Sequence, residues 1–105
     1  MAYKYAISFR IDTDTHGGHT YSDRYSSFMD QVRKTSVWEE TTSFALTVSD
    51  ETIENFVARL YLGSKFNAVT DLMVVIDIEQ GVAVTKGEVS YPATLSSKLN
   101  RLAQK

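Results

Sequence analysis

Apolar and polar side chains alternate through Tyr3-Lys4-Tyr5-Ala6-Ile7-Ser8-Phe9-Arg10-Ile11-Asp12, near the start of the chain. A period of two over this length predicts a β-strand with one face in a hydrophobic core. The predicted core face carries only apolar side chains: Tyr3, Tyr5, Ile7, Phe9 and Ile11. The other face is small and polar and ends in a carboxylate, so we expect it to be left for a partner or a binding site.

Two amphipathic helices follow from apolar residues at helical spacing. The first stripe consists of Tyr21, Tyr25, Phe28 and Val32, and the second of Ile53, Phe56, Val57, Leu60 and Tyr61. Thr20 or Ser22 is expected to cap the first helix, and Ser49 the second. Arg24 lies off the first stripe and is expected in solvent, and Gly63 is expected to end the second helix in a left-handed cap.

The remaining segments predict strands and a short tail. Residues 37–48 are rich in Val, Trp, Thr and Phe and predict two strands with a turn near residues 40–42. Residues 72–78 are apolar on both faces, which is typical of a central strand covered on both sides. Gly81 and Gly87 bracket a short strand, and Leu95, Leu99 and Leu102 predict a short helix after Pro92.

The order strand, helix, strand, strand, helix, strand predicts an α+β protein with a ferredoxin-like βαββαβ sandwich. Both helices would cover one face, with the first and fourth strands in the middle of the sheet. We expect a domain over residues 1–80 and a C-terminal extension over residues 81–105, formed by an additional strand and a short helix and associated with a dimer. The uncovered face is expected to carry Ser8, Arg10, Asp12, Met73, Val75 and Asp77, and an apolar centre there predicts a homodimer.

Composition sets further limits. The chain has 105 residues, a net charge of −2 and no cysteine, which predicts one domain without disulfides or Cys-based zinc sites. The net negative charge argues against a protein whose whole surface binds nucleic acid, although it leaves room for a local basic patch on a dimer. No apolar run reaches the length of about 20 residues that a membrane span needs. We therefore expect a cytoplasmic protein without a membrane partner.

Asp12, Asp14, His16 and His19 form the densest set of candidate metal ligands. Oxygen ligands favour Mg²⁺ or Mn²⁺, and two subunits that each present Asp12 would share one ion. The histidines suit zinc or nickel better, or act as general acid and base. The alternative is that Asp, Thr, Gly and His simply form a tight loop here, because these residues tolerate turns.

Three other features have two interpretations each. Arg10 either grips a phosphate or pairs with a carboxylate at a dimer interface. Trp38 either stacks on a base or belongs to the core or an interface. Lys98, Arg101 and Lys105 make the tail basic, which suits either an acidic partner or an ordinary solvated surface.

Residues 3–79 resemble small bacterial ferredoxin-like proteins related to CRISPR-associated protein 2 and virulence-associated protein D. The resemblance rests on Tyr5–Asp12, on Trp38 with Thr42–Thr47, on Asp50–Ile53 and on Asp71–Asp77. It implies that Asp12 lies at a dimer cleft and takes part in metal-dependent phosphodiester cleavage. It also implies that Val82–Val84 packs on a neighbouring subunit. The chain departs from that family in carrying Asp14, His16 and His19 where basic or aromatic residues are usual.

Three functional hypotheses follow. The first is a homodimeric interaction module of a bacterial or phage system, and the second is a metal-dependent endonuclease that cleaves RNA or DNA through Asp12. The third is a small-molecule sensor, which ferredoxin-like dimers often are, and no feature of the sequence favours it. The sequence leaves open whether the protein is an enzyme.

Overall fold

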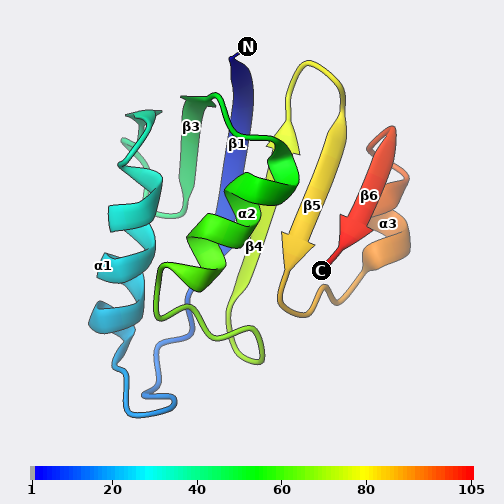
Figure 1. Ribbon diagram of the computed structural model, residues 1–105. Helices are drawn as coiled ribbons and strands as arrows, with labels where there is room; N and C mark the ends of the chain where they lie inside the picture. The colour runs from blue at the N-terminus through cyan, green and yellow to red at the C-terminus, as the bar shows by residue number, and fades with distance from the viewer. Residues whose placement is uncertain (1) are drawn as a thin grey trace.

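Strand β1 (Tyr3–Arg10) lies inside a six-stranded sheet in the computed structural model, which describes residues 2–105 (Figure 1). The strand order is β2-β3-β1-β4-β5-β6, and only the β5–β6 pair is parallel. The protein is therefore an α+β fold with a mixed sheet. The other elements are α1 (Tyr21–Val32), β2 (Ser36–Trp38), β3 (Phe44–Ser49), α2 (Ile53–Leu62), β4 (Leu72–Asp77), β5 (Val82–Lys86), α3 (Pro92–Ser96) and β6 (Arg101–Gln104).

Helices α1 and α2 pack on the same face of the sheet, as the sequence predicted (Figure 1). Phe9 of β1 contacts Phe28 of α1, and Tyr5 contacts Phe56 of α2, each pair with ring centroids 5.0 Å apart. Both helix stripes supply fully buried side chains to this single core. The alternation in β1 therefore correctly identified its core face, and β1 and β4 are the two middle strands.

The prediction that Met73, Val75 and Asp77 lie on the uncovered face is wrong. In the antiparallel β1–β4 pair, Phe9 lies opposite Met73 and Ile7 opposite Val75. Directly opposed residues point to the same face, so these side chains lie beneath the helices, where Met73 and Val75 are fully buried. A strand that is apolar on both faces contains no period of two, so its sequence does not show which face is which.

The opposite face of the sheet, called here the open face, is not covered by α1 or α2. Ser8 and Arg10 lie on it, as predicted, and both are exposed. Residue 12 follows the end of β1 and lies in a loop rather than on the sheet. By register, the open face of the four strands β2, β3, β1 and β4 carries Ser36, Trp38, Phe44, Leu46, Val48, Lys4, Ala6, Ser8, Arg10, Leu72, Val74 and Ile76.

The C-terminal extension continues the same sheet. Strand β5 pairs with β4 of its own chain, through a tight connection in which Asp77 accepts the backbone N–H groups of Glu79 and Gln80. This pairing in the same chain differs from the packing on a neighbouring subunit that the resemblance implies. Leu102 lies in strand β6 and not in the predicted helix, which is only five residues long.

Helix α3 lies behind β6, on the side of the sheet away from α1 and α2 (Figure 1). Ala83 and Thr85 point to that side by register and are fully buried. The extension therefore covers the β5–β6 end of the second face. The β2–β3–β1 part stays exposed.

Two of the predicted helix ends differ from the structure. Thr20 caps α1 in a capping box with Asp23, as one of the two predicted options, but Thr52 and not Ser49 caps α2. Gly63 has φ of −86°, so the prediction of a left-handed cap is wrong. Glycine is required there by space, since a Cβ atom would lie 2.7 Å from Gln31 Cδ and 2.8 Å from the Arg59 carbonyl oxygen.

Within residues 2–105, none of the helices combines the length and the apolar character that crossing a membrane requires. The longest of these helices, α1, has 12 residues.

The neighbouring valines Val74 and Val75 test the orientation of β4. We expect Val75→Ala to lower the free energy of unfolding by about 2 kcal/mol, because it opens a cavity in the core. Val74→Ala removes the same atoms from a half-exposed position and should cost less than about 1 kcal/mol. Urea denaturation of dilute protein measures both changes, and equal losses would contradict the observed register.

Candidate functional site

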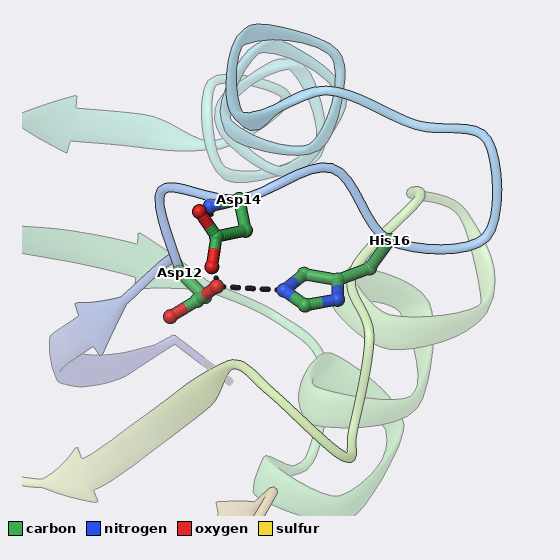
Figure 2. Close-up of side chains that lie close together, drawn as sticks. All are labelled: Asp12, Asp14 and His16. Carbon is green, nitrogen blue, oxygen red and sulfur yellow. Dashed lines mark hydrogen bonds and ion pairs between the residues drawn. The ribbon is translucent and has the colours of Figure 1, made fainter.

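Three of the four predicted metal ligands come together in the loop between β1 and α1. Asp12, Asp14 and His16 each offer a ligand atom, and these atoms all lie within 4.8 Å of one another (Figure 2). His16 Nε2 is 2.6 Å from Asp12 Oδ2, and the backbone N–H of Asp14 donates to the same oxygen at 3.2 Å. The loop thus presents two carboxylates and one imidazole at the end of the sheet.

His19 does not join this group. The backbones of His16 and His19 exchange two hydrogen bonds of 2.9 Å across Gly17 and Gly18, whose φ angles are +59° and +77°. Positive φ at both central residues forms a tight two-residue turn that favours glycine. The role of His19 is therefore to close this turn, while the imidazole of His16 reaches back to Asp12.

The side chains of this group are partly accessible: 40 % of Asp12 and 25 % of His16 are exposed. The hydrogen bond with His16, together with that from the Asp14 backbone, lowers the pKa of Asp12 below its usual value. Asp12 is therefore ionised at neutral pH, which is the state that a metal ligand needs.

Arg24 of α1 holds the loop between β1 and α1 in place. The prediction that Arg24 is exposed to solvent is wrong. Its side chain is fully buried, and its guanidinium donates to the carbonyl oxygens of Asp14 and His19 at 2.9 Å each and to that of Asp12. Three loop carbonyls thus converge on one cation. Because the guanidinium carries five donors in a rigid fork, it can satisfy several acceptors at once.

Asp71 supplies the opposite charge. Its Oδ2 accepts from Arg24 Nε at 3.1 Å and from the Asn67 backbone at 2.9 Å, and its Oδ1 accepts from the Asp12 backbone at 2.9 Å. Both side chains of this ion pair have no exposed surface. A buried pair is tolerated when further hydrogen bonds satisfy both ions, as they do here.

Sequence reasoning missed Arg24 and Asp71 as parts of this site. Arg24 lies three residues after Tyr21 and four before Phe28, at the flank of the apolar stripe. That position is compatible with burial, but only a carboxylate from a distant segment makes the burial of a charge acceptable. Asp71 is 47 residues away along the chain, so no local pattern links the two.

A second candidate site lies on the open face, over β2, β3 and β1. Four large apolar side chains are exposed there to between 36 % and 43 %: Trp38, Phe44, Leu46 and Val48. Trp38 is therefore a surface residue; its ring meets Phe44 edge-on, with centroids 6.5 Å apart, and its Nε1 donates to Glu40 Oε2 at 2.5 Å. Beside them is a hollow of about 310 Å³, lined by Lys4, Tyr5, Ser36, Val37, Trp38, Leu46, Thr47, Val48 and Ile78.

Two other predicted site residues have different surroundings. Arg10 is exposed on the open face and belongs to none of the ion pairs within residues 2–105. Asp12 pairs with His16 and not with Arg10. Asp77 is nearly buried on the helix side, where it closes the turn after β4, so it is not a partner of Asp12.

The contribution of the Arg24–Asp71 pair to the free energy of unfolding can be measured with Arg24→Met. This substitution keeps an unbranched side chain and removes the charge. We expect it to cost about 3 kcal/mol or more of unfolding free energy, because Asp71 would stay buried without its counter-ion. The control is Arg33→Met, which breaks the exposed pair with Glu39 and should cost less than about 1 kcal/mol. Chemical denaturation of both variants checks this, and similar losses would contradict the role given to Arg24.

Comparisons with known proteins do not place the chain in a family. No protein-family model matches it, and it has no significant match among curated proteins or solved structures.

Proposed function

We propose that this protein is a homodimeric interaction module that pairs with a second copy of itself through the open face. One observation supports this best: the row of exposed apolar side chains formed by Trp38, Phe44, Leu46 and Val48. Contiguous apolar surface of this kind on a small protein marks an interaction site.

The size of the open face suits a modest dimer. Four strands spaced about 4.8 Å apart, each about 20 Å long, give a footprint on the order of 400 Å² before the relief of side chains is counted. That is about half of the roughly 800 Å² that each partner buries in a standard specific interface, and it falls in the range of weak, transient interfaces. We therefore expect an equilibrium between monomer and dimer that depends on protein concentration.

The order of the strands and helices supports a ferredoxin-like fold as part of this proposal. The order β2-β3-β1-β4, with α1 and α2 on one face, supports a ferredoxin-like sandwich with an extension formed by β5, α3 and β6. Such a sandwich leaves one sheet face free for pairing. The absence of cysteine fits a cytosolic setting for this module.

The dimer proposal is tested by sedimentation equilibrium over a concentration series. We expect wild-type protein to dimerise and Leu46→Asp to raise the dissociation constant at least about tenfold, because the charge would be buried in the interface. Leu62→Asp is the control, since Leu62 is 77 % exposed on α2, away from the open face. A wild-type protein that stays monomeric at every concentration would overturn the proposal.

A second candidate function is metal-dependent cleavage of RNA or DNA, favoured by the grouping of Asp12, Asp14 and His16. Carboxylates suit Mg²⁺ or Mn²⁺, and a bound cation would activate water and neutralise charge on a phosphate. All three groups come from one chain, so this candidate does not need two Asp12 side chains at a dimer cleft. Within residues 2–105, no observation favours the small-molecule sensor.

The nuclease candidate is tested by incubating the protein with RNA and with DNA in Mg²⁺ or Mn²⁺. If it is correct, Asp12→Asn lowers the cleavage rate at least about 100-fold, because the cation loses a ligand and the activated water. Asp30→Asn is the matched control, since Asp30 is an exposed aspartate on α1. Cleavage that is unaffected by Asp12→Asn, or that persists in excess chelator, would rule out this site.

A further inference from the structure

Two features lie next to one another on the open face: a pair of exposed aromatic rings, called here the ridge, and a hollow. The ridge consists of the rings of Trp38 and Phe44, which meet edge-on. Leu46, Val48, Ile78 and Lys4 are among the residues that line the hollow, and Trp38 of the ridge forms one of its walls. Phe44 is two residues from Leu46 on β3, about 7 Å away, whereas Trp38 lies directly opposite Leu46 on β2.

A ridge beside a hollow makes this surface self-complementary. In a two-fold dimer the same patch is used by both subunits, so each feature must meet its complement in the second copy. A two-fold axis that lies in the interface, parallel to the sheet, and passes between ridge and hollow at right angles to the line joining them brings the ridge of each copy over the hollow of the other. The apolar rings would then be buried against Leu46, Val48 and Ile78, all of which are exposed in the single chain.

The charges beside these features are complementary under the same rotation. Glu40 adjoins the ridge, because its carboxylate accepts from the indole N–H of Trp38. Lys4 borders the hollow and is exposed. Neither residue belongs to an ion pair in the described part of the chain. When the ridge meets the hollow of a second copy, Glu40 approaches Lys4 of that copy, and this happens twice per dimer.

The geometry points to an isologous dimer in which the Trp38–Phe44 ridge fills the hollow of a second copy and Glu40 pairs with Lys4 of that copy. This inference rests on the proposed function and adds to it the partner's docking geometry. The rings supply most of the binding energy, since buried aromatic anchors dominate interfaces. The two charge pairs at the border fix the orientation and disfavour other ways of stacking the two sheets.

Charge reversal tests the pairing. Lys4→Glu and Glu40→Lys should each raise the dimer dissociation constant about tenfold, because both contacts in the dimer become repulsive. An equimolar mixture of the two variants should associate about as tightly as wild type, since each Glu then faces a Lys. The double variant Lys4→Glu/Glu40→Lys should also dimerise, and Lys98→Glu, an exposed charge near α3, should change nothing.

Trp38 provides an independent readout, because it is the only tryptophan in the chain. Its emission should shift to shorter wavelength as protein concentration rises through the dissociation constant, and Phe44→Ala should weaken the dimer that this shift reports. Circular dichroism of each variant checks that it is folded before association is measured.

The outcomes separate the two proposals. If wild-type protein dimerises but the reversed variants associate as tightly as wild type, or the mixture fails to recover, this docking geometry is wrong and the homodimer itself stands. A Trp38 emission that does not change on dimerisation leads to the same conclusion. If wild-type protein remains monomeric throughout, the homodimer and this geometry fail together.

Discussion

The ion pair between Arg24 and Asp71 ties together three segments that would otherwise be independent. Arg24 comes from α1, Asp71 precedes β4, and the loop between β1 and α1 wraps around the guanidinium with the carbonyl oxygens of Asp12, Asp14 and His19. Taking two charges out of water costs several kcal/mol, which is offset here because both ions are surrounded by hydrogen-bond partners. The pair therefore acts by specifying where the loop lies.

The metal-ligand candidates depend on this pair. Asp12, Asp14 and His16 converge in a loop whose backbone is held by Arg24, and the hydrogen bond between Asp12 and His16 adds to this. The Asp12 backbone N–H itself donates to Asp71, which places the carboxylate of Asp12 next to His16. A loop that is ordered before any cation arrives loses less entropy when it binds one.

The open face is a separate feature that depends on the register of β1 and β4. Because Ile7 lies opposite Val75, these two side chains enter the core. The side chains of Val74 and Ile76 remain on the open face. A shift of one residue would exchange the two sets. The loop lies at the end of the sheet and the apolar patch on its surface, so the proposed homodimer and the candidate metal site would use different residues.

Much of the fold followed from local patterns. The alternation of Tyr5, Ile7 and Phe9 identified β1 and its core face, and the helical spacing of the two apolar stripes identified α1 and α2. The grouping of Asp12, Asp14 and His16 was also visible, because they are neighbours in the chain. His19 was added to the predicted metal ligands because it is close to them in the sequence. After the turn at Gly17 and Gly18, however, its side chain does not join Asp12, Asp14 and His16.

By itself, the sequence determined the five strands β1 to β5, the helices α1 and α2, and the polar loop after the first strand, since those features depend on spacing along the chain; strand β6 was not among them. Only the tertiary structure decided which face of β4 enters the core, whether Arg24 is buried, and that Gly63 is needed for space and not for its φ angle. Each of these depends on a segment distant in sequence: β1 for β4, Asp71 for Arg24, and Gln31 for Gly63. Burial of a charge or a side chain is a property of what packs against it, and the local sequence does not contain that information.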